Sequence, residues 1–272
     1  MAYHLVHHRN GSTSVACADN DEIMHPSVGP EIESRTLYVE GLRLAEELAL
    51  NGRLRVWDVG MGAAANALSA IEALSPLPGR VDLLSFDHTS DALRFASNHA
   101  EHFPSIARHQ DAVDELLNSG TASFGNVHWR YIESDFPKWL TAGHAEAPPD
   151  AILFDAWSPR ANPGMWTFEL FQQLRQRVSE RAALATYSRA TCIRSALLLA
   201  GFHVGRGPAT GAKEETTVAA TCLDMLRDPL PKQWLLKAER SHSGRPFLTN
   251  VFEQAPLSDD QLKQLHAHPQ FR

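Results

Sequence analysis

Short apolar runs alternate with amphipathic segments along the middle of the chain. Five such runs stand between polar or turn-forming residues, at 54–59, 81–86, 127–132, 151–154 and 182–187. Runs of this kind are typical of strands that are buried on both faces of a parallel sheet. The segments between them predict helices. These helices are expected at 63–74, 90–101, 109–118, 167–178 and 190–200.

The N-terminal region carries signals of its own. Residues 3–9 and 12–18 alternate in polarity around Asn10-Gly11, and an Asn-Gly pair is a strong short signal for a tight β-hairpin. Ser34 is the predicted N-cap of the helix that completes this region. We therefore expect residues 1–50 to form a small extension made of one β-hairpin and one helix.

The last two predicted strands differ from the others in how they are connected. A short glycine-rich link joins residues 201–204 to residues 216–222, whereas a parallel crossover needs a dozen or more residues. These strands are therefore expected to pair antiparallel. Residues 51–239 would then form an α/β domain, a Rossmann-like doubly wound sheet with one reversed strand near an edge. Among doubly wound folds, the reversed strand favours the class I S-adenosyl-L-methionine (SAM)-dependent methyltransferase fold.

The C-terminal tail, residues 240–272, is expected to lie outside this domain. Ser258-Asp259-Asp260-Gln261 has the form of a capping box and predicts one short final helix. The sequence contains no run of about 18 apolar residues, so no membrane span is predicted. The N-terminus lacks the pattern of a secretory signal. Three isolated cysteines suggest neither a disulfide framework nor a metal site. We expect a cytoplasmic protein.

Charge is distributed unevenly along the chain. Residues 1–171 carry 11 Lys and Arg against 23 Asp and Glu, whereas residues 172–245 carry 12 against 6. The densest cations are Arg175, Arg177, Arg181, Arg189, Arg194, Arg206 and Lys213. Such asymmetry suggests a polyanionic partner. The alternative is that these side chains cover the outer faces of surface helices, because phosphate binding requires that they cluster on one face.

Acidic residues stand at the ends of the first three predicted strands, where parallel sheets bind ligands. Asp58 leads into Gly60-Met61-Gly62, whose glycines permit a sharp turn and a close approach to a ligand. Asp87, followed by His88, is placed to bind two ribose hydroxyls, and Asp135-Phe136 offers a carboxylate and a ring for an adenine. The third glycine of the dinucleotide fingerprint is missing, which is acceptable for a ligand without a pyrophosphate, such as SAM. The alternative is that these are turn glycines and helix-capping aspartates.

The fourth apolar run delivers Asp155 onto a loop that contains prolines and tryptophans. A carboxylate at this edge of the sheet is placed to accept a proton from a nitrogen nucleophile or to orient it; otherwise it is a turn aspartate. Trp157 is a candidate for the pocket wall, because its ring can stack on a base or face a cation. Trp166 is expected to pack the loop onto the domain. Tyr187, after the fifth run, is expected to line the substrate pocket or to pack in the core.

Asp155 also opens an Asp-x-x-x-Pro-x-x-Asn-Pro-x-Met-Trp stretch that ends at Trp166. Further residues match the pattern of the same family: Glu33-Ser34-Arg35, Tyr38-Val39, Gly41, Asp58 to Gly62 with Asn66, Leu184 to Ser188 and Gly201-Phe202. On these residues the chain resembles the MnmC-like methyltransferase family, the methyltransferase domain of bifunctional tRNA-modifying proteins and its single-domain relatives. The resemblance implies that SAM methylates the aminomethyl group of a modified wobble uridine in tRNA, with Asp155 acting at the amine. It also implies that Asn66 belongs to the SAM site and Pro159 to the substrate site. The charge asymmetry makes the basic region 172–245 the expected contact for tRNA.

The sequence departs from this family near the last hairpin. Lys213-Glu214-Glu215 replaces the usual basic stretch, which argues against an RNA contact there. The chain has no room for a flavin-dependent half, so other proteins would have to make the aminomethyl group. Two alternatives stay open: a SAM-dependent methyltransferase of a small-molecule amine, and a SAM-binding protein without catalysis. No metal is expected, because His4, His7 and His8 lie on differing faces of one predicted strand.

Overall fold

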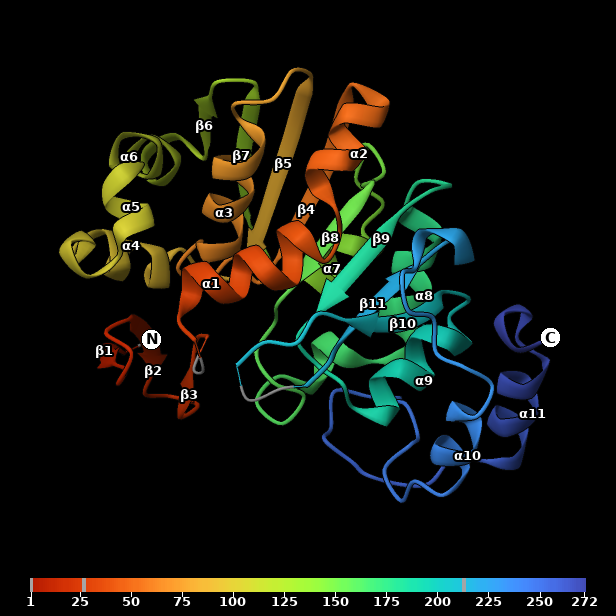
Figure 1. Ribbon diagram of the computed structural model, residues 1–272. Helices are drawn as coiled ribbons and strands as arrows, with labels where there is room; N and C mark the ends of the chain where they lie inside the picture. The colour runs from red at the N-terminus through yellow and green to blue at the C-terminus, as the bar shows by residue number, and fades with distance from the viewer. Residues whose placement is uncertain (1, 26–27, 212–213) are drawn as a thin grey trace.

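A twisted eight-stranded sheet, covered by helices on both faces, forms the body of the molecule, and a three-stranded sheet lies beside it (Figure 1). The computed structural model describes residues 2–25, 28–211 and 214–272. The order of the large sheet is β10-β11-β9-β8-β4-β5-β7-β6. Its strands are β4 (Arg53–Val59), β5 (Arg80–Asp87), β6 (Thr121–Phe124), β7 (Val127–Glu133), β8 (Ala151–Phe154), β9 (Ala183–Thr186), β10 (His203–Gly207) and β11 (Thr216–Ala220).

The five central strands run parallel, and they match the five predicted runs to within one residue at each end. β4 pairs with β5 and β8, β5 pairs with β7, and β8 pairs with β9. β11 runs antiparallel to both β9 and β10, so the predicted antiparallel pair and the reversed strand are confirmed. The chain therefore has the class I methyltransferase fold that the pattern predicted.

The sequence did not predict β6, which forms the second edge and pairs antiparallel with β7. In its Thr-Ala-Ser-Phe sequence only Ala122 is buried. An edge strand needs no apolar run, because one of its sides and part of its faces are in contact with solvent. The hydrophobic pattern therefore carries no signal for this strand.

Two apolar clusters lie on opposite faces of the large sheet. Along β4, Leu54 and Val56 belong to one cluster, and Trp57 and Val59 belong to the other, as alternation along a strand requires. The first face is covered by α2 (Leu44–Asn51), α3 (Ala65–Leu74), α4 (Asp91–Ser97), α5 (Pro104–Arg108) and α6 (Gln110–Ser119). The second is covered by α7 (Phe136–Thr141), α8 (Phe168–Arg177) and α9 (Thr191–Leu199). The helices α5 and α7 were not predicted.

The predicted N-terminal hairpin is confirmed, since β1 (Tyr3–His7) pairs antiparallel with β2 (Thr13–Cys17), and β3 (Glu22–Ile23) extends this small sheet. The predicted helix start at Ser34 is wrong. Helix α1 (Pro30–Ser34) begins four residues earlier, with proline at its first turn, where its missing N–H is not needed. Ser34 itself is buried and caps nothing. A π-helix, η1 (Arg35–Glu40), and a break precede α2.

The C-terminal tail packs onto the second face of the sheet. Helix α11 (Asp259–Ala267) begins with the predicted capping box, because the side chain of Ser258 accepts from the backbone of Gln261 and the glutamine side chain accepts in return. An unpredicted helix, α10 (Trp234–Glu239), packs beside it. Phe247 and Leu265 are buried in the same apolar cluster as α8 and α9. The division of the chain at residues 50 and 239 stays a prediction.

Candidate functional site

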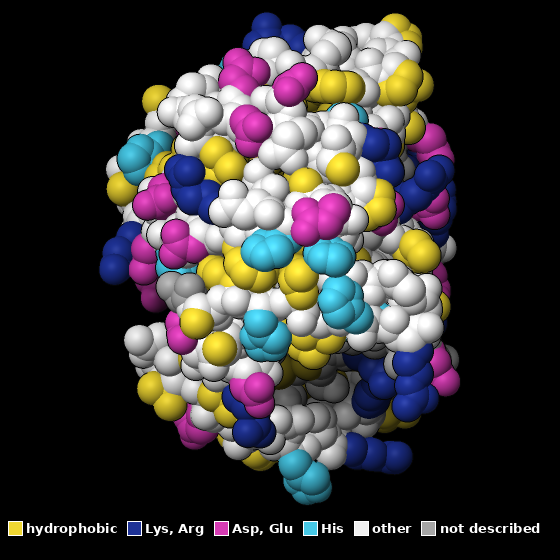
Figure 2. Space-filling view, turned by 90° about the vertical axis from the view of Figure 1, so that its left-hand side faces the viewer, with side chains coloured by type: hydrophobic (Ala, Val, Ile, Leu, Met, Phe, Trp, Pro, Cys, Tyr) yellow, Lys and Arg dark blue, Asp and Glu magenta, His cyan; other side chains and the backbone are white. Residues whose placement is uncertain are grey.

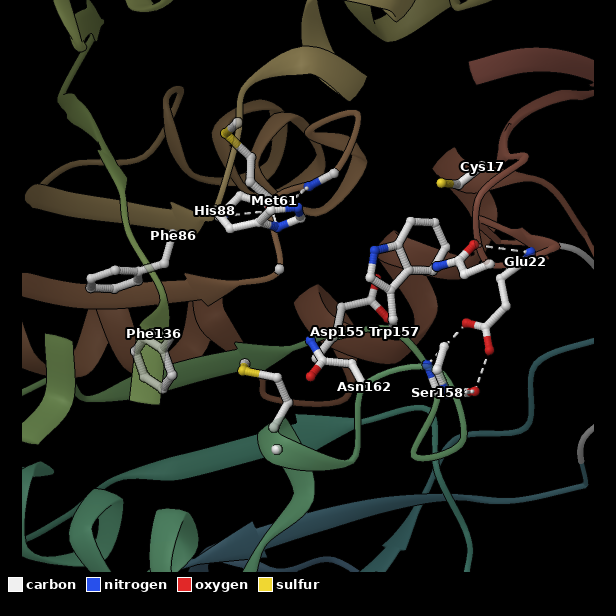
Figure 3. A pocket seen from close by; sticks show the side chains of 18 of the residues that line it. Cys17, Glu22, Met61, Phe86, His88, Phe136, Asp155, Trp157, Ser158 and Asn162 are labelled. Atoms are coloured by element: carbon white, nitrogen blue, oxygen red, sulfur yellow. Dashed lines mark hydrogen bonds and ion pairs between the residues drawn. The ribbon is translucent and has the colours of Figure 1, made fainter. Parts of the chain in front are cut away.

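A cavity of about 1110 Å³ lies at the carboxyl ends of the parallel strands. Residues that follow β4, β5, β7, β8 and β9 line it, as expected for an open parallel sheet. The N-terminal sheet and the C-terminal tail contribute as well, through Glu22 and His25 on one side and Leu248 to Asn250 on the other. Figure 3 shows Phe86 and Phe136 at one end of this cavity, apart from Asp155 and Trp157.

The turn after β4 is built around Gly60, which has a φ of +88°. A Cβ atom at this position would lie 2.6 Å from the carbonyl oxygen of Asp155. The sequence predicted that this glycine allows a close approach to a ligand. In the structure the close approach is to the backbone of the loop after β8, so Gly60 sets the spacing between two walls of the cavity.

Asp87 and His88 lie where the sequence predicted them, at the end of β5 in the cavity. One carboxylate oxygen of Asp87 accepts from the N–H of Gly62 at 2.9 Å, and the other accepts from the N–H of His88 at 2.8 Å. The imidazole of His88 also lies 2.9 Å from Asp87. This hydrogen bond raises the pKa of His88. A carboxylate has about four acceptor positions, so Asp87 retains capacity for ligand hydroxyls.

At the end of the third predicted strand, Asp135 is both a cavity residue and a helix cap. Asp135 lines the cavity, but it is also the N-cap of α7, and its side chain accepts from the N–H of Lys138. Phe136 lines the cavity from a buried position, and its ring lies 5.0 Å from the ring of Phe86. These rings give this end of the cavity an aromatic wall.

Three residues expected at the site do not line the cavity: Asp58, Asn66 and Pro159. Asp58 is completely buried and accepts a hydrogen bond from Ser85 at 2.8 Å. Burial raises its pKa to about 7. Asn66 is also buried, and its amide donates to a carboxylate oxygen of Asp155 at 2.8 Å. Asn66 therefore holds Asp155 in place, and its predicted contact with SAM has no support in the geometry.

Asp155 is the centre of a polar cluster in the cavity wall. Its side chain is 16% exposed, and its carboxylate lies 3.6 Å from Nε2 of His25. On the far side of the imidazole, Nδ1 lies 3.7 Å from a carboxylate oxygen of Glu33. The sequence did not single out His25, which follows the small sheet with no motif around it. Glu33 was singled out only through the family resemblance.

Two buried tyrosines fix the backbone around Asp155. The hydroxyl of Tyr38 donates to the carbonyl of Phe154 at 3.4 Å, and that of Tyr187 donates to the carbonyl of Ala156 at 3.1 Å. Burial, reinforced by the charge of Asp155, raises the pKa of both phenols well above the usual value. Both therefore stay neutral hydrogen-bond donors. Tyr187 also lines the cavity and packs against the second apolar cluster, and its role in a substrate pocket stays a prediction.

The two tryptophans of the loop after β8 have different positions. Trp166 is fully buried, and its indole N–H donates to the carbonyl of Trp157 at 2.8 Å, which confirms the packing role expected for it. Trp157 is partly exposed and lines the cavity. Nearby, Glu22 of β3 accepts from the backbone N–H of Ser158 at 3.0 Å and contacts its hydroxyl (Figure 3). The small sheet is thus fastened to this loop.

Carboxylates dominate the charge of the cavity. Eight of them are found among the lining residues, namely Asp19, Asp21, Glu22, Glu33, Asp87, Asp135, Asp155 and Glu169. Within the described residues, Lys138 is the one lysine or arginine in this lining, and it is already paired with Asp135. A cleft lined by one sign of charge concentrates ligands of the opposite sign. The cavity therefore favours cationic ligands.

The basic stretch 172–213 does not form a single free surface. Arg194 is buried and pairs with Glu215 at 2.9 Å, and Arg206 pairs with the same carboxylate. Arg181 pairs with Asp224, and Lys213 lies outside the described residues. Much of the basic excess is therefore used in ion pairs. Figure 2 shows a different face, the side that carries α4, α5 and α6 in Figure 1, where histidine side chains gather in the middle.

The described part of the chain holds neither a candidate metal cluster nor a candidate membrane span. In residues 2–25, 28–211 and 214–272, no group of three or more His, Cys, Asp or Glu side chains is arranged to hold a metal ion. No helix in these ranges has both the length and the apolar character needed to cross a bilayer.

Comparison with known proteins agrees with this geometry. Residues 132–222 match a family model described as S-adenosyl-L-methionine-dependent methyltransferase. Among curated proteins, the chain is 27% identical over 227 residues to the tRNA 5-methylaminomethyl-2-thiouridine biosynthesis bifunctional protein MnmC of Methylibium petroleiphilum, covering 78% of this chain and 34% of that protein. For the protein of the same name from Ralstonia nicotianae the identity is 28% over 214 residues, with coverages of 74% and 32%. The chain thus spans about a third of the length of these relatives.

A solved structure extends the similarity to nearly the whole chain. The crystal structure of MnmC2 from Aquifex aeolicus matches with a TM-score of 0.72 and 20% identity, covering 98% of this chain and 86% of that one. At this identity the match establishes the fold, including the N-terminal sheet and the C-terminal tail within the matched length.

Proposed function

We propose that this chain, which resembles the MnmC-like SAM-dependent methyltransferases, methylates the aminomethyl group of a modified wobble uridine in tRNA. The observation that carries the proposal is the position of Asp155. A carboxylate follows a fully buried strand, is held by Asn66, and faces an acidic cavity that favours a cationic amine.

The donor end of the cavity fits SAM. The carboxylate of Asp87 orders the turn through the N–H of Gly62, and Phe86 and Phe136 provide an aromatic wall beyond it. We assign Asp87 and His88 to the ribose, Phe136 and Asp135 to the adenine, and Gly60, Met61 and Gly62 to the rest of the donor. When bound, SAM supplies a methyl group on a positively charged sulfur. Asp58 accepts from Ser85 and Asn66 donates to Asp155, so both lie behind the cavity lining.

The acceptor end would prepare the nitrogen for attack. An alkyl amine is protonated at neutral pH, so its N–H bond must break and leave the electron pair on nitrogen. We assign the proton to a carboxylate oxygen of Asp155. Trp157 and Tyr187 would wall the acceptor, exclude water and orient the amine. Pro159 acts on the shape of the loop, since it does not line the cavity.

The acidic lining of the cavity affects which kind of molecule can carry the amine, a tRNA or a small molecule. Eight carboxylates attract an ammonium group but repel phosphates, so we expect the RNA backbone to stay outside the cavity, where only the modified base enters. The same lining favours the alternative acceptor, a small-molecule amine. We propose a cytoplasmic location, with which the three free cysteines Cys17, Cys192 and Cys222 are consistent.

The deciding experiment is nucleoside mass spectrometry of tRNA from a strain that lacks this gene. We expect the unmethylated aminomethyl nucleoside to accumulate, and the purified protein with SAM to convert it. An unchanged nucleoside profile, together with turnover of free amines, would replace tRNA by the small-molecule acceptor. Binding of tRNA that does not weaken with added salt would also count against the RNA partner.

The role of Asp155 is tested in the same assay. Asp155→Asn should slow methyl transfer by at least a hundredfold, in the range typical of proton transfer by a positioned side chain, and it should retain SAM affinity. Asp224→Asn is the matched control, because Asp224 is exposed and pairs with Arg181 away from the cavity. Wild-type turnover in Asp155→Asn would remove the assigned role, and loss of SAM binding would move Asp155 to the donor site.

A further inference from the structure

His25 is held in an unusual position between two carboxylates. Its φ of +53° is a left-handed conformation that residues other than glycine rarely adopt. Its carbonyl accepts a hydrogen bond from the hydroxyl of Ser14 at 3.1 Å, which fixes the backbone. Its imidazole is 12% exposed and has Asp155 on one side and Glu33 on the other. Strained residues of this kind concentrate at functional sites.

The groups around His25 come from several elements. Glu33 belongs to α1, Asp58 ends β4, and Asp155 follows β8, and each of these acidic groups favours a positive charge on the imidazole. Tyr38 of η1 stays neutral beside them. Burial alone would disfavour the imidazolium, but Asp155 and Glu33 outweigh it, so the pKa of His25 is raised.

A protonated His25 offsets one of the two negative charges of Glu33 and Asp155. With a neutral imidazole, the two carboxylates would share one wall without a positive charge between them. Such crowding drives one carboxylate to take up a proton, and a protonated Asp155 cannot accept a proton from an amine. Asn66 does not solve this problem, because an amide supplies a hydrogen bond without a net charge.

We propose that His25 is a positioning residue for the acceptor: as an imidazolium between Glu33 and Asp155, it keeps the Asp155 carboxylate ionised and directed into the cavity. The proposal rests on the proposed function for its consequence in catalysis. The charge state of His25 itself is measurable without any reaction. The N-terminal small sheet thereby supplies part of the acceptor site.

The first test is titration of the histidine rings by NMR. The signal that disappears in His25→Gln identifies His25 among the 14 histidines. We expect it to titrate above 6.5 in the wild-type protein and at least one pH unit lower in Asp155→Asn, while Asp224→Asn leaves it unchanged. A signal at or below 6.5, or one that Asp155→Asn does not move, would overturn the proposal. If His25→Gln does not fold, Glu33→Gln replaces it, and the signal that it shifts downward identifies His25.

The second test compares turnover of His25→Gln with wild type on the same amine at each pH. The ionisation of the amine cancels in this ratio. We expect the deficit of the variant to grow at least tenfold between pH 8.5 and pH 6, while His128→Gln, an exposed histidine of β7, shows no deficit. A deficit that is constant with pH would show a merely structural role and refute the proposal. If no amine is methylated at all, the proposed function fails, and the NMR result still decides the charge of His25.

Discussion

The contact between Asn66 and Asp155 gives the sharpest prediction. Asn66→Ala removes a hydrogen bond of 2.8 Å to a carboxylate. Hydrogen bonds to charged groups contribute about 1.5–3 kcal/mol. If that contribution serves to orient Asp155, the rate should fall by roughly ten- to a hundredfold, since about 1.36 kcal/mol corresponds to a factor of ten. The affinity for SAM should stay unchanged, because Asn66 does not line the cavity.

The assay combines steady-state methyl transfer with calorimetric titration of SAM. Asn126→Ala is the matched control, since Asn126 directly precedes β7, at the end of the sheet opposite the site, and donates to the carbonyls of Leu74 and Leu77. Both variants should lower the free energy of unfolding, but only Asn66→Ala should lower the turnover rate. A tenfold loss of SAM affinity at unchanged turnover would refute the reasoning and restore Asn66 to the donor site, as the family resemblance implies.

Three further substitutions test other features of the structure. Glu215→Ala should cost about 3 kcal/mol in urea unfolding, because it leaves the buried Arg194 without its carboxylate. Gly60→Ala should lower both stability, by about 1–3 kcal/mol, and turnover, because its φ is +88° and its Cβ would clash with the loop after β8. Asp58 has a folded pKa of about 7, above its ordinary value of 3.8. The folded state therefore binds a proton that the unfolded state has lost, and stability should fall between pH 4 and pH 7 by up to about 1.4 kcal/mol per pH unit. Asp58→Asn should flatten this dependence in urea unfolding.

Each of these predictions has its own control or contradicting result. Gly52→Ala also has a positive φ but meets no atom within 4 Å, so equal loss of turnover in both glycine variants would contradict the role given to Gly60. Wild-type stability of Glu215→Ala would show that Arg194 does not depend on its carboxylate. An unaltered pH dependence in Asp58→Asn would mean that another group takes up the proton.

The sheet was predictable because its central strands are buried on both faces. Complete burial produces an unbroken apolar run in the sequence, and a short run between turn-forming residues favours a strand over a helix. The hydrophobic pattern did not predict β6 or α7, and the reason differs between the two elements. β6 is an edge strand with one buried residue. α7 is a six-residue helix whose N-cap is Asp135, and an aspartate at a strand end is equally typical of a ligand site.

The site was predictable at the strand ends and not between them. Asp87 ends β5 and Asp155 directly follows β8, so the fold places both of them. His25 reaches the same cavity from a segment more than a hundred residues away from Asp155, through a left-handed backbone conformation that leaves no mark in the sequence. Asn66 was expected to contact SAM, but its amide donates to Asp155. The position of a buried residue in the sequence does not reveal which way its side chain points.

The contact between Glu22 and Ser158 has a consequence for the order in which the protein is made. The two residues are 136 positions apart. The small sheet therefore leaves the ribosome long before the loop after β8, which it contacts in the folded protein, has been synthesised. Until that loop emerges, the acidic groups of the first 33 residues have no opposite wall, and the exposed edge of the small sheet has no partner from the main domain. A nascent chain is therefore in its most vulnerable state between these two moments. Amino-terminal fusions or truncations should lower the yield of active protein more than changes at the C-terminal helix do.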